Sequence, residues 1–146
     1  MEAAQGLSAL LARSAGDRSA VVNAASDVRQ CGPDLARDAQ IFASAIASRQ
    51  QLLNRLASLS GASSLPTGMV EALTGAWESS VQADQDYAAW ARDESAAGCA
   101  ANGPDPNLAA ALAPADAANA DKMTFVSMWN PLATRYGLAT YSWSQL

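Results

Sequence analysis

The chain of 146 residues contains no histidine, and Lys122 is its one lysine. Without histidine, a Ser-His-Asp or Cys-His catalytic arrangement is excluded, and so is a histidine-ligated metal or haem. Its two cysteines do not complete a tetrahedral zinc shell, so we expect no metal site. The chain also lacks a P-loop and a dinucleotide-binding fingerprint, and its reactive side chains do not cluster along the sequence. These absences predict a protein that is not an enzyme and uses no cofactor.

Positive charge and long apolar runs are scarce as well. The net charge is −5 with scattered acidic residues, and the missing basic patch argues against nucleic-acid binding. Apolar runs such as residues 108–113 are too short to cross a bilayer. The first residues lack the basic region and long apolar stretch of a signal peptide. If the protein is exported, its targeting segment or membrane tether therefore lies outside this chain.

Alanine and helical spacing are what the chain has in abundance. Half of its residues are hydrophobic, and a large share of these are alanines, which favour helices that approach each other closely. Apolar residues recur at steps of three and four over 7–28, 35–56, 70–91 and 108–129, as on one face of a helix. We therefore predict one all-α domain over 1–146, an antiparallel up-down four-helix bundle with a short C-terminal helix and tail.

Proline, glycine and capping residues predict where these helices begin and end. Gly32 is the expected left-handed residue after the first helix, and Pro33 the first residue of the second. Thr67 and Asp105 are the expected N-caps of the third and fourth helices. Pro114 predicts a kink or a restart within the fourth helix.

A compact group of signals follows near the C-terminus. Asn130 precedes a proline, which predicts that the fourth helix ends there and that a short helix starts at Pro131. Gly137 is expected to close that short helix in a left-handed conformation, with Leu138 packing back. We interpret this stretch as a structural corner, after which the tail packs along the bundle or docks on a partner. The alternative is an interaction surface formed by Trp129, Asn130, Tyr141 and Trp143.

The two cysteines fall in loops that such a bundle places at the same end. Cys31 follows the first helix and Cys99 follows the third. In an up-down bundle these two loops are adjacent, which predicts a Cys31–Cys99 disulfide and hence an oxidising compartment. The alternative is a pair of buried, unpaired cysteines in a cytosolic protein.

A long or charged side chain interrupts each of the four apolar stripes. At ~1.5 Å of rise per residue all four fall near ~20 Å from the cysteine end, in the middle of the bundle. Three interpretations are open: charged ends that reach water from the stripe edges, an ion pair of Asp84 with Lys122 or an arginine, and a site for an anionic ligand. The four residues of this predicted polar layer are Arg18, Arg49, Asp84 and Lys122.

Two stretches carry a resemblance to a known family. The first is residues 83–99, in which the matching residues are Tyr87, Trp90 and Gly98-Cys99. The second is residues 121–138, in which they are Lys122, Phe125, Trp129-Asn130-Pro131 and Tyr136-Gly137-Leu138. Together with residues 20–31 and 49–59 they resemble uncharacterised extracytoplasmic helical domains of actinobacteria, often found behind a single membrane anchor. The resemblance implies export, in a tethered or a secreted form, and the Cys31–Cys99 pair. It implies no activity.

These observations favour an extracytoplasmic interaction or sensing module that recognises a protein, an envelope component or a small molecule. The main alternative is a small-ligand carrier with an apolar or anionic ligand between the helices, and a structural spacer is a third. A cavity of several hundred Å3, the usual scale of ligand sites, favours the carrier, and a full core favours the module or the spacer. The aromatic residues that would line such a cavity, or else fill the core, are Trp77, Tyr87, Trp90 and Phe125.

Overall fold

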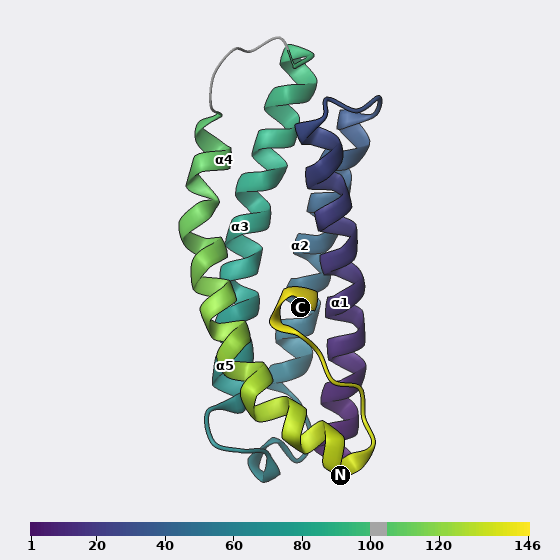
Figure 1. The fold of residues 1–146 in the computed structure, drawn as a ribbon, viewed down its shortest axis with the longest axis vertical. Helices are drawn as coiled ribbons and strands as arrows, with labels where there is room; N and C mark the ends of the chain where they lie inside the picture. Colours follow the sequence, from purple (N-terminus) through teal and green to yellow (C-terminus); the bar gives the residue numbers. More distant parts are fainter. Residues whose placement is uncertain (100–104) are drawn as a thin grey trace.

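The computed structural model describes residues 1–99 and 105–146, and this part of the chain is an antiparallel bundle of four long helices without a strand (Figure 1). The predicted all-α up-down bundle is thus confirmed. The helices are α1 (Glu2–Arg29), α2 (Leu35–Ala57), α3 (Met69–Ala97), the short α4 (Pro106–Ala110) and α5 (Leu112–Tyr136), and the 3-10 turns are η1 (Ala62–Ser64) and η2 (Trp143–Gln145).

The long helices pack mainly on their neighbours along the chain, α1 on α2, α2 on α3, and α3 on α5. The C-terminal segment then runs back over the bundle, and η2 contacts both α5 and α1 (Figure 1). Leu146 ends this segment fully buried. The tail therefore packs along the bundle, in the place where α1 and α5 would otherwise face each other.

Two hydrophobic clusters make up the core. The cluster towards the N-terminal end of α1 holds the largest side chains, among them Trp77, Phe125 and Trp129, all with no exposed surface. The cluster towards the disulfide is built from Phe42, Trp90 and many alanines. The alanines let the helices approach closely there, as their abundance predicts. The predicted polar layer lies between the two clusters.

The disulfide between Cys31 and Cys99 is present, with 6.1 Å between the two Cα atoms. The alternative of two unpaired cysteines is therefore wrong. Both cysteines adopt left-handed backbone conformations, with φ of 52° and 57°. This was not expected at Cys31, because Gly32 was the predicted left-handed residue. The Gly32 amide instead donates to the carbonyl of Asp27 at 2.8 Å, so the chain reverses one residue earlier than predicted.

The N-terminal ends of the helices confirm some capping predictions and correct others. Asp105 caps α4 by accepting from the amides of Asn107 and Leu108. Pro33 does not begin α2, because Asp34 is its N-cap and accepts from the amide of Arg37. Thr67 does not cap α3 either. The residue before that helix is Gly68 with φ of 83°, a conformation that favours glycine over threonine.

Two prolines affect the fourth helical segment differently. The break expected at Pro114 is present, but it lies at Ala111, between α4 and α5. The end expected at Asn130 is wrong, since α5 continues through Pro131 to Tyr136 and curves across the lower end of the bundle (Figure 1). Continuing the helix keeps Trp129 and Ala133, four residues apart and both fully buried, on one face.

The C-terminal end of α5 follows its prediction. Gly137 has a φ of 67°, and the amide of Leu138 donates to the carbonyl of Ala133 at 2.8 Å. Leu138 packs against the larger hydrophobic cluster. In the described residues, none of the helices combines the length and the apolarity that crossing a membrane requires.

Candidate functional site

The four residues of the predicted polar layer surround one cavity of about 120 Å3. Each comes from a different long helix: Arg18 from α1, Arg49 from α2, Asp84 from α3 and Lys122 from α5. Because each interrupts its apolar stripe at a similar distance from the disulfide, the antiparallel bundle brings them to one level. The layer predicted from helical rise is therefore a real structural feature.

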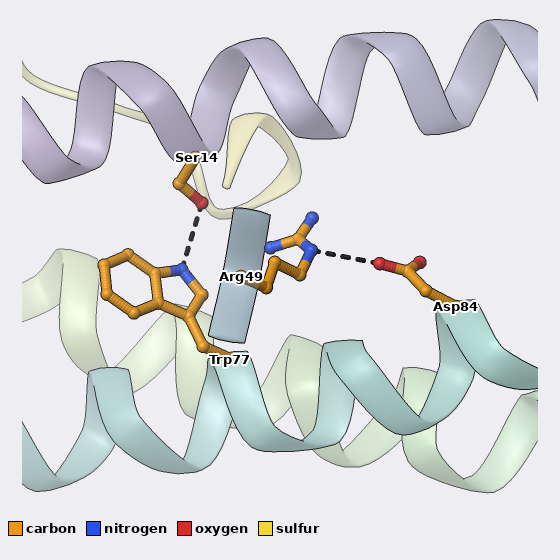
Figure 2. Close-up of polar contacts among 4 residues, drawn as sticks. All are labelled: Ser14, Arg49, Trp77 and Asp84. Atoms are coloured by element: carbon orange, nitrogen blue, oxygen red, sulfur yellow. Dashed lines mark hydrogen bonds and ion pairs between the residues drawn. The ribbon is translucent and has the colours of Figure 1, made fainter. Parts of the chain in front are cut away.

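Arg49 and Asp84 form a buried ion pair. Arg49 Nε donates to Asp84 Oδ2 at 3.1 Å, and their side chains are 1% and 5% exposed (Figure 2). The ion-pair interpretation thus holds, with Arg49 as the partner of Asp84. The interpretation that the charged ends reach water is wrong for these two residues and for Lys122, which is 3% exposed.

Arg18 occupies a different position in the layer. It is only partly buried, and its Nε donates to the carbonyl of Ser144 at 3.4 Å. This long contact joins α1 to the C-terminal segment. Arg18 therefore lies at the edge of the cavity, next to the tail.

Several donors in the layer have no protein partner. Arg49 Nη1 is fully buried and makes no hydrogen bond. Within the described residues, Lys122 also makes neither a hydrogen bond nor an ion pair. A charged donor that is fully buried and unsatisfied, as Arg49 Nη1 is, is costly. The layer thus carries more positive charge and more donors than its own residues satisfy.

The electrostatic environment shifts the pKa values of three of these groups. Burial lowers the pKa of Lys122 from 10.5 to about 7, and the nearby Arg49 and Arg18 act in the same direction. Burial also lowers the pKa of Arg18. Burial raises the pKa of Asp84, although its attraction to Arg49 and to the other two cations opposes that rise. The layer therefore holds a lysine that changes charge near neutral pH.

This lysine predicts a stability that rises with pH. Between pH 7 and 10.5 the unfolded lysine stays protonated while the folded one loses its proton. The free energy of unfolding should then increase by up to about 1.4 kcal/mol per pH unit in that window. Denaturant unfolding at a series of pH values measures it. Lys122→Met should lack this rise, and equal slopes in the variant and the parent would refute a buried, titrating lysine.

The remaining wall of the cavity was not identified from the sequence as one site. Polar groups come from Ser80, Tyr87 and Asn119, and the small side chains of Ala83, Ala115 and Ala118 leave the space open. Helical spacing could have identified two of them. Ser80 lies four residues before Asp84, and Asn119 lies three residues before Lys122, so each shares a helix face with a residue of the polar layer. Nearby, Trp77 Nε1 donates to Ser14 Oγ at 3.0 Å (Figure 2), which satisfies a buried indole.

The predicted surface of four C-terminal residues is not supported as a unit. Trp129 is fully buried and donates to the carbonyl of Ala139 at 3.0 Å. The Asn130 side chain exchanges two hydrogen bonds with the backbone of Tyr141, at 2.8 and 3.0 Å. These two residues hold the tail in place. Asn130, Tyr141 and Trp143 are partly exposed, and only Trp129 is buried.

The aromatic side chains themselves fill the space in which the small-ligand-carrier hypothesis would require an apolar pocket. Trp77 and Phe125 have no exposed surface, and Tyr87 stacks on Phe42 with 5.7 Å between ring centroids and contacts Trp90. A hollow of about 400 Å3 between α2 and α3 is an open groove lined by alanines, Gln40, Arg92 and Ser95, without these aromatic side chains. The polar cavity is therefore the better candidate for a binding site.

Comparison of the chain with protein-family models, with curated proteins and with solved structures found no match. The resemblance to actinobacterial extracytoplasmic domains accordingly stays a prediction.

Proposed function

We propose that the protein is a non-enzymatic extracytoplasmic sensing module whose input is a small ligand bound in the polar cavity between its four helices. The observation that carries this proposal is the buried Arg49 Nη1, which faces no protein acceptor in a layer to which every long helix contributes. A ligand there would contact α1, α2, α3 and α5 at once. Its binding would be coupled to the packing of the whole bundle.

The extracytoplasmic part of the proposal rests on the Cys31–Cys99 disulfide, a bond typical of oxidising compartments. The resemblance to exported helical domains supports it. A protein or envelope component would then read the liganded state of the bundle. A carrier of large apolar ligands is less well supported, because the aromatic side chains fill the core.

Filling the cavity tests the proposal. Ala118 is a buried wall residue, so Ala118→Leu places a larger side chain where the ligand would sit. Ala117→Leu, on the exposed face of the same helix, is the matched control. We expect a panel of small charged and neutral compounds to contain a ligand that raises the melting temperature of the parent and of Ala117→Leu by roughly 5–10 °C at a hundredfold excess over Kd.

Ala118→Leu should fold and show little of that shift. The proposal fails if no compound stabilises the parent, which would favour a structural spacer. It also fails if the cavity-filled variant responds as the parent does, because the ligand then binds elsewhere.

A further inference from the structure

The charges around the cavity point to the kind of ligand it would hold. Three cationic side chains, Arg18, Arg49 and Lys122, face one carboxylate, Asp84. That carboxylate is already engaged by Arg49 Nε at 3.1 Å. The cavity therefore keeps an excess of positive charge among mostly buried side chains, where charge interactions are stronger than in bulk water.

The size of the cavity limits the ligand. Its volume is about 120 Å3, which corresponds to roughly four water molecules at their share of liquid volume, about 30 Å3 each. A nucleotide, a sugar or an aromatic acid is too large to fit inside it whole. An anion of about four or five heavy atoms fits this space.

We propose that the cavity binds one small oxyanion, either a simple carboxylate or a tetrahedral anion of the phosphate or sulfate type, with the Arg49 guanidinium and the Lys122 ammonium as its main contacts. This inference rests on the proposed function and names the ligand class for that site. Arg18 adds positive charge at the cavity edge, and Ser80 and Asn119 add neutral hydrogen-bonding groups.

The geometry of Arg49 supports an oxyanion in particular. A guanidinium has five N–H donors in a planar fork that matches carboxylate and phosphate oxygens. In the described residues, Arg49 uses its Nε for Asp84, and its buried Nη1 has no partner. Water could accept a hydrogen bond there but would leave the excess charge uncompensated. A cation would be repelled by three like charges.

Anion binding at this site should also take up protons. Burial, Arg49 and Arg18 lower the pKa of Lys122 to about 7, while Asp84 opposes that lowering, and Tyr87 lines the same cavity. A bound anion favours the charged lysine and raises that pKa. Affinity should therefore fall by up to tenfold per pH unit above pH 7, and the raised pKa of Asp84 adds a gain in affinity at acidic pH.

The experiment titrates the protein with sodium acetate, phosphate and sulfate at constant ionic strength, by calorimetry and thermal shift, with chloride as the reference anion. Glycerol phosphate and a short peptide with a free carboxylate form a second arm. We expect at least one free anion to bind, because the cavity admits it whole, and the bulkier compounds to bind at least tenfold more weakly. If the bulkier compounds bind equally well, the anionic group lies at the mouth of the cavity, and the proposal that the cavity encloses the whole anion is wrong.

Three variants assign the contacts. Lys122→Gln and Arg49→Lys should each weaken anion binding at least tenfold, the second while keeping the charge that faces Asp84. Arg55→Gln, an exposed cation on the same helix as Arg49, should bind like the parent. The loss of affinity above pH 7 should disappear in Lys122→Gln, while the gain at acidic pH that Asp84 causes should remain. Unchanged affinity in both cavity variants overturns the assignment.

The two proposals fail in different ways. If a neutral or cationic compound of the wider panel binds in a manner that Ala118→Leu abolishes while every anion fails, the oxyanion inference falls and the ligand-sensing function stands. If no compound of any charge binds, both fall.

Discussion

Asp84→Asn should lower the free energy of unfolding by about 3–5 kcal/mol, the usual cost of breaking a buried ion pair by removing one partner. The variant keeps the shape of the side chain but removes the negative charge next to Arg49, whose side chain is 1% exposed. Lys122, 3% exposed, also loses the one carboxylate that lines its cavity. Arg49 and Arg18 would then remain charged without compensation, next to a Lys122 whose pKa Asp84 no longer raises, which explains why a substitution of nearly equal volume should be so costly.

Urea unfolding at neutral pH measures this effect, with Glu78→Gln as a control that removes an exposed carboxylate from the same helix. The loss should shrink at acidic pH, where Asp84 is itself protonated. A double variant, Arg49→Met with Asp84→Leu, should recover most of the lost stability, because apolar side chains of similar volume often replace a buried pair without penalty. An Asp84→Asn protein as stable as its parent would mean that the pair contributes no net stability.

The layer also shows what sequence periodicity can and cannot predict. Constant rise per residue was sufficient to place Arg18, Arg49, Asp84 and Lys122 at one level. It could not tell which cation pairs with Asp84, because that choice depends on side-chain geometry across the helix interface. It also did not identify the space left by Ala115 and Ala118, which depends on how closely α5 approaches its neighbours.

Local signals were less dependable at the helix ends. Pro131 was expected to start a new helix, yet tertiary packing of Trp129 and Ala133 keeps α5 continuous. Asn130 was considered as an exposed contact, but its amide holds the backbone of Tyr141. In both cases a contact distant in sequence outweighed the local preference, and no local pattern contains that information.

Breaking the Cys31–Cys99 disulfide should lower the free energy of unfolding by about 4 kcal/mol, because the bond closes a loop across a sequence separation of 68 residues and restricts the unfolded chain. For a domain of this size that corresponds to a decrease in melting temperature on the order of 10 °C. Melting with and without reductant measures it, and the intact mass of the unreduced chain should lie two hydrogens below that of the reduced one. The fold should survive, since both core clusters lie along the bundle below the bond.

Two double variants distinguish the effect of the disulfide on stability from the effect of the strained backbone at the two cysteines. Cys31→Ala with Cys99→Ala removes the bond but keeps side chains at two left-handed positions, φ 52° and 57°, whereas Cys31→Gly with Cys99→Gly also removes the strain. Both double variants should be insensitive to reductant. Compared with the alanine pair, the glycine pair should avoid about 1–2 kcal/mol of backbone strain per residue in the folded state. The greater conformational freedom of glycine in the unfolded chain offsets part of that gain in stability. If reductant frees both thiols without changing the melting temperature of the parent, loop closure contributes no stability. If both thiols can be alkylated in the native, unreduced protein, the bond is absent and the argument for an oxidising compartment fails.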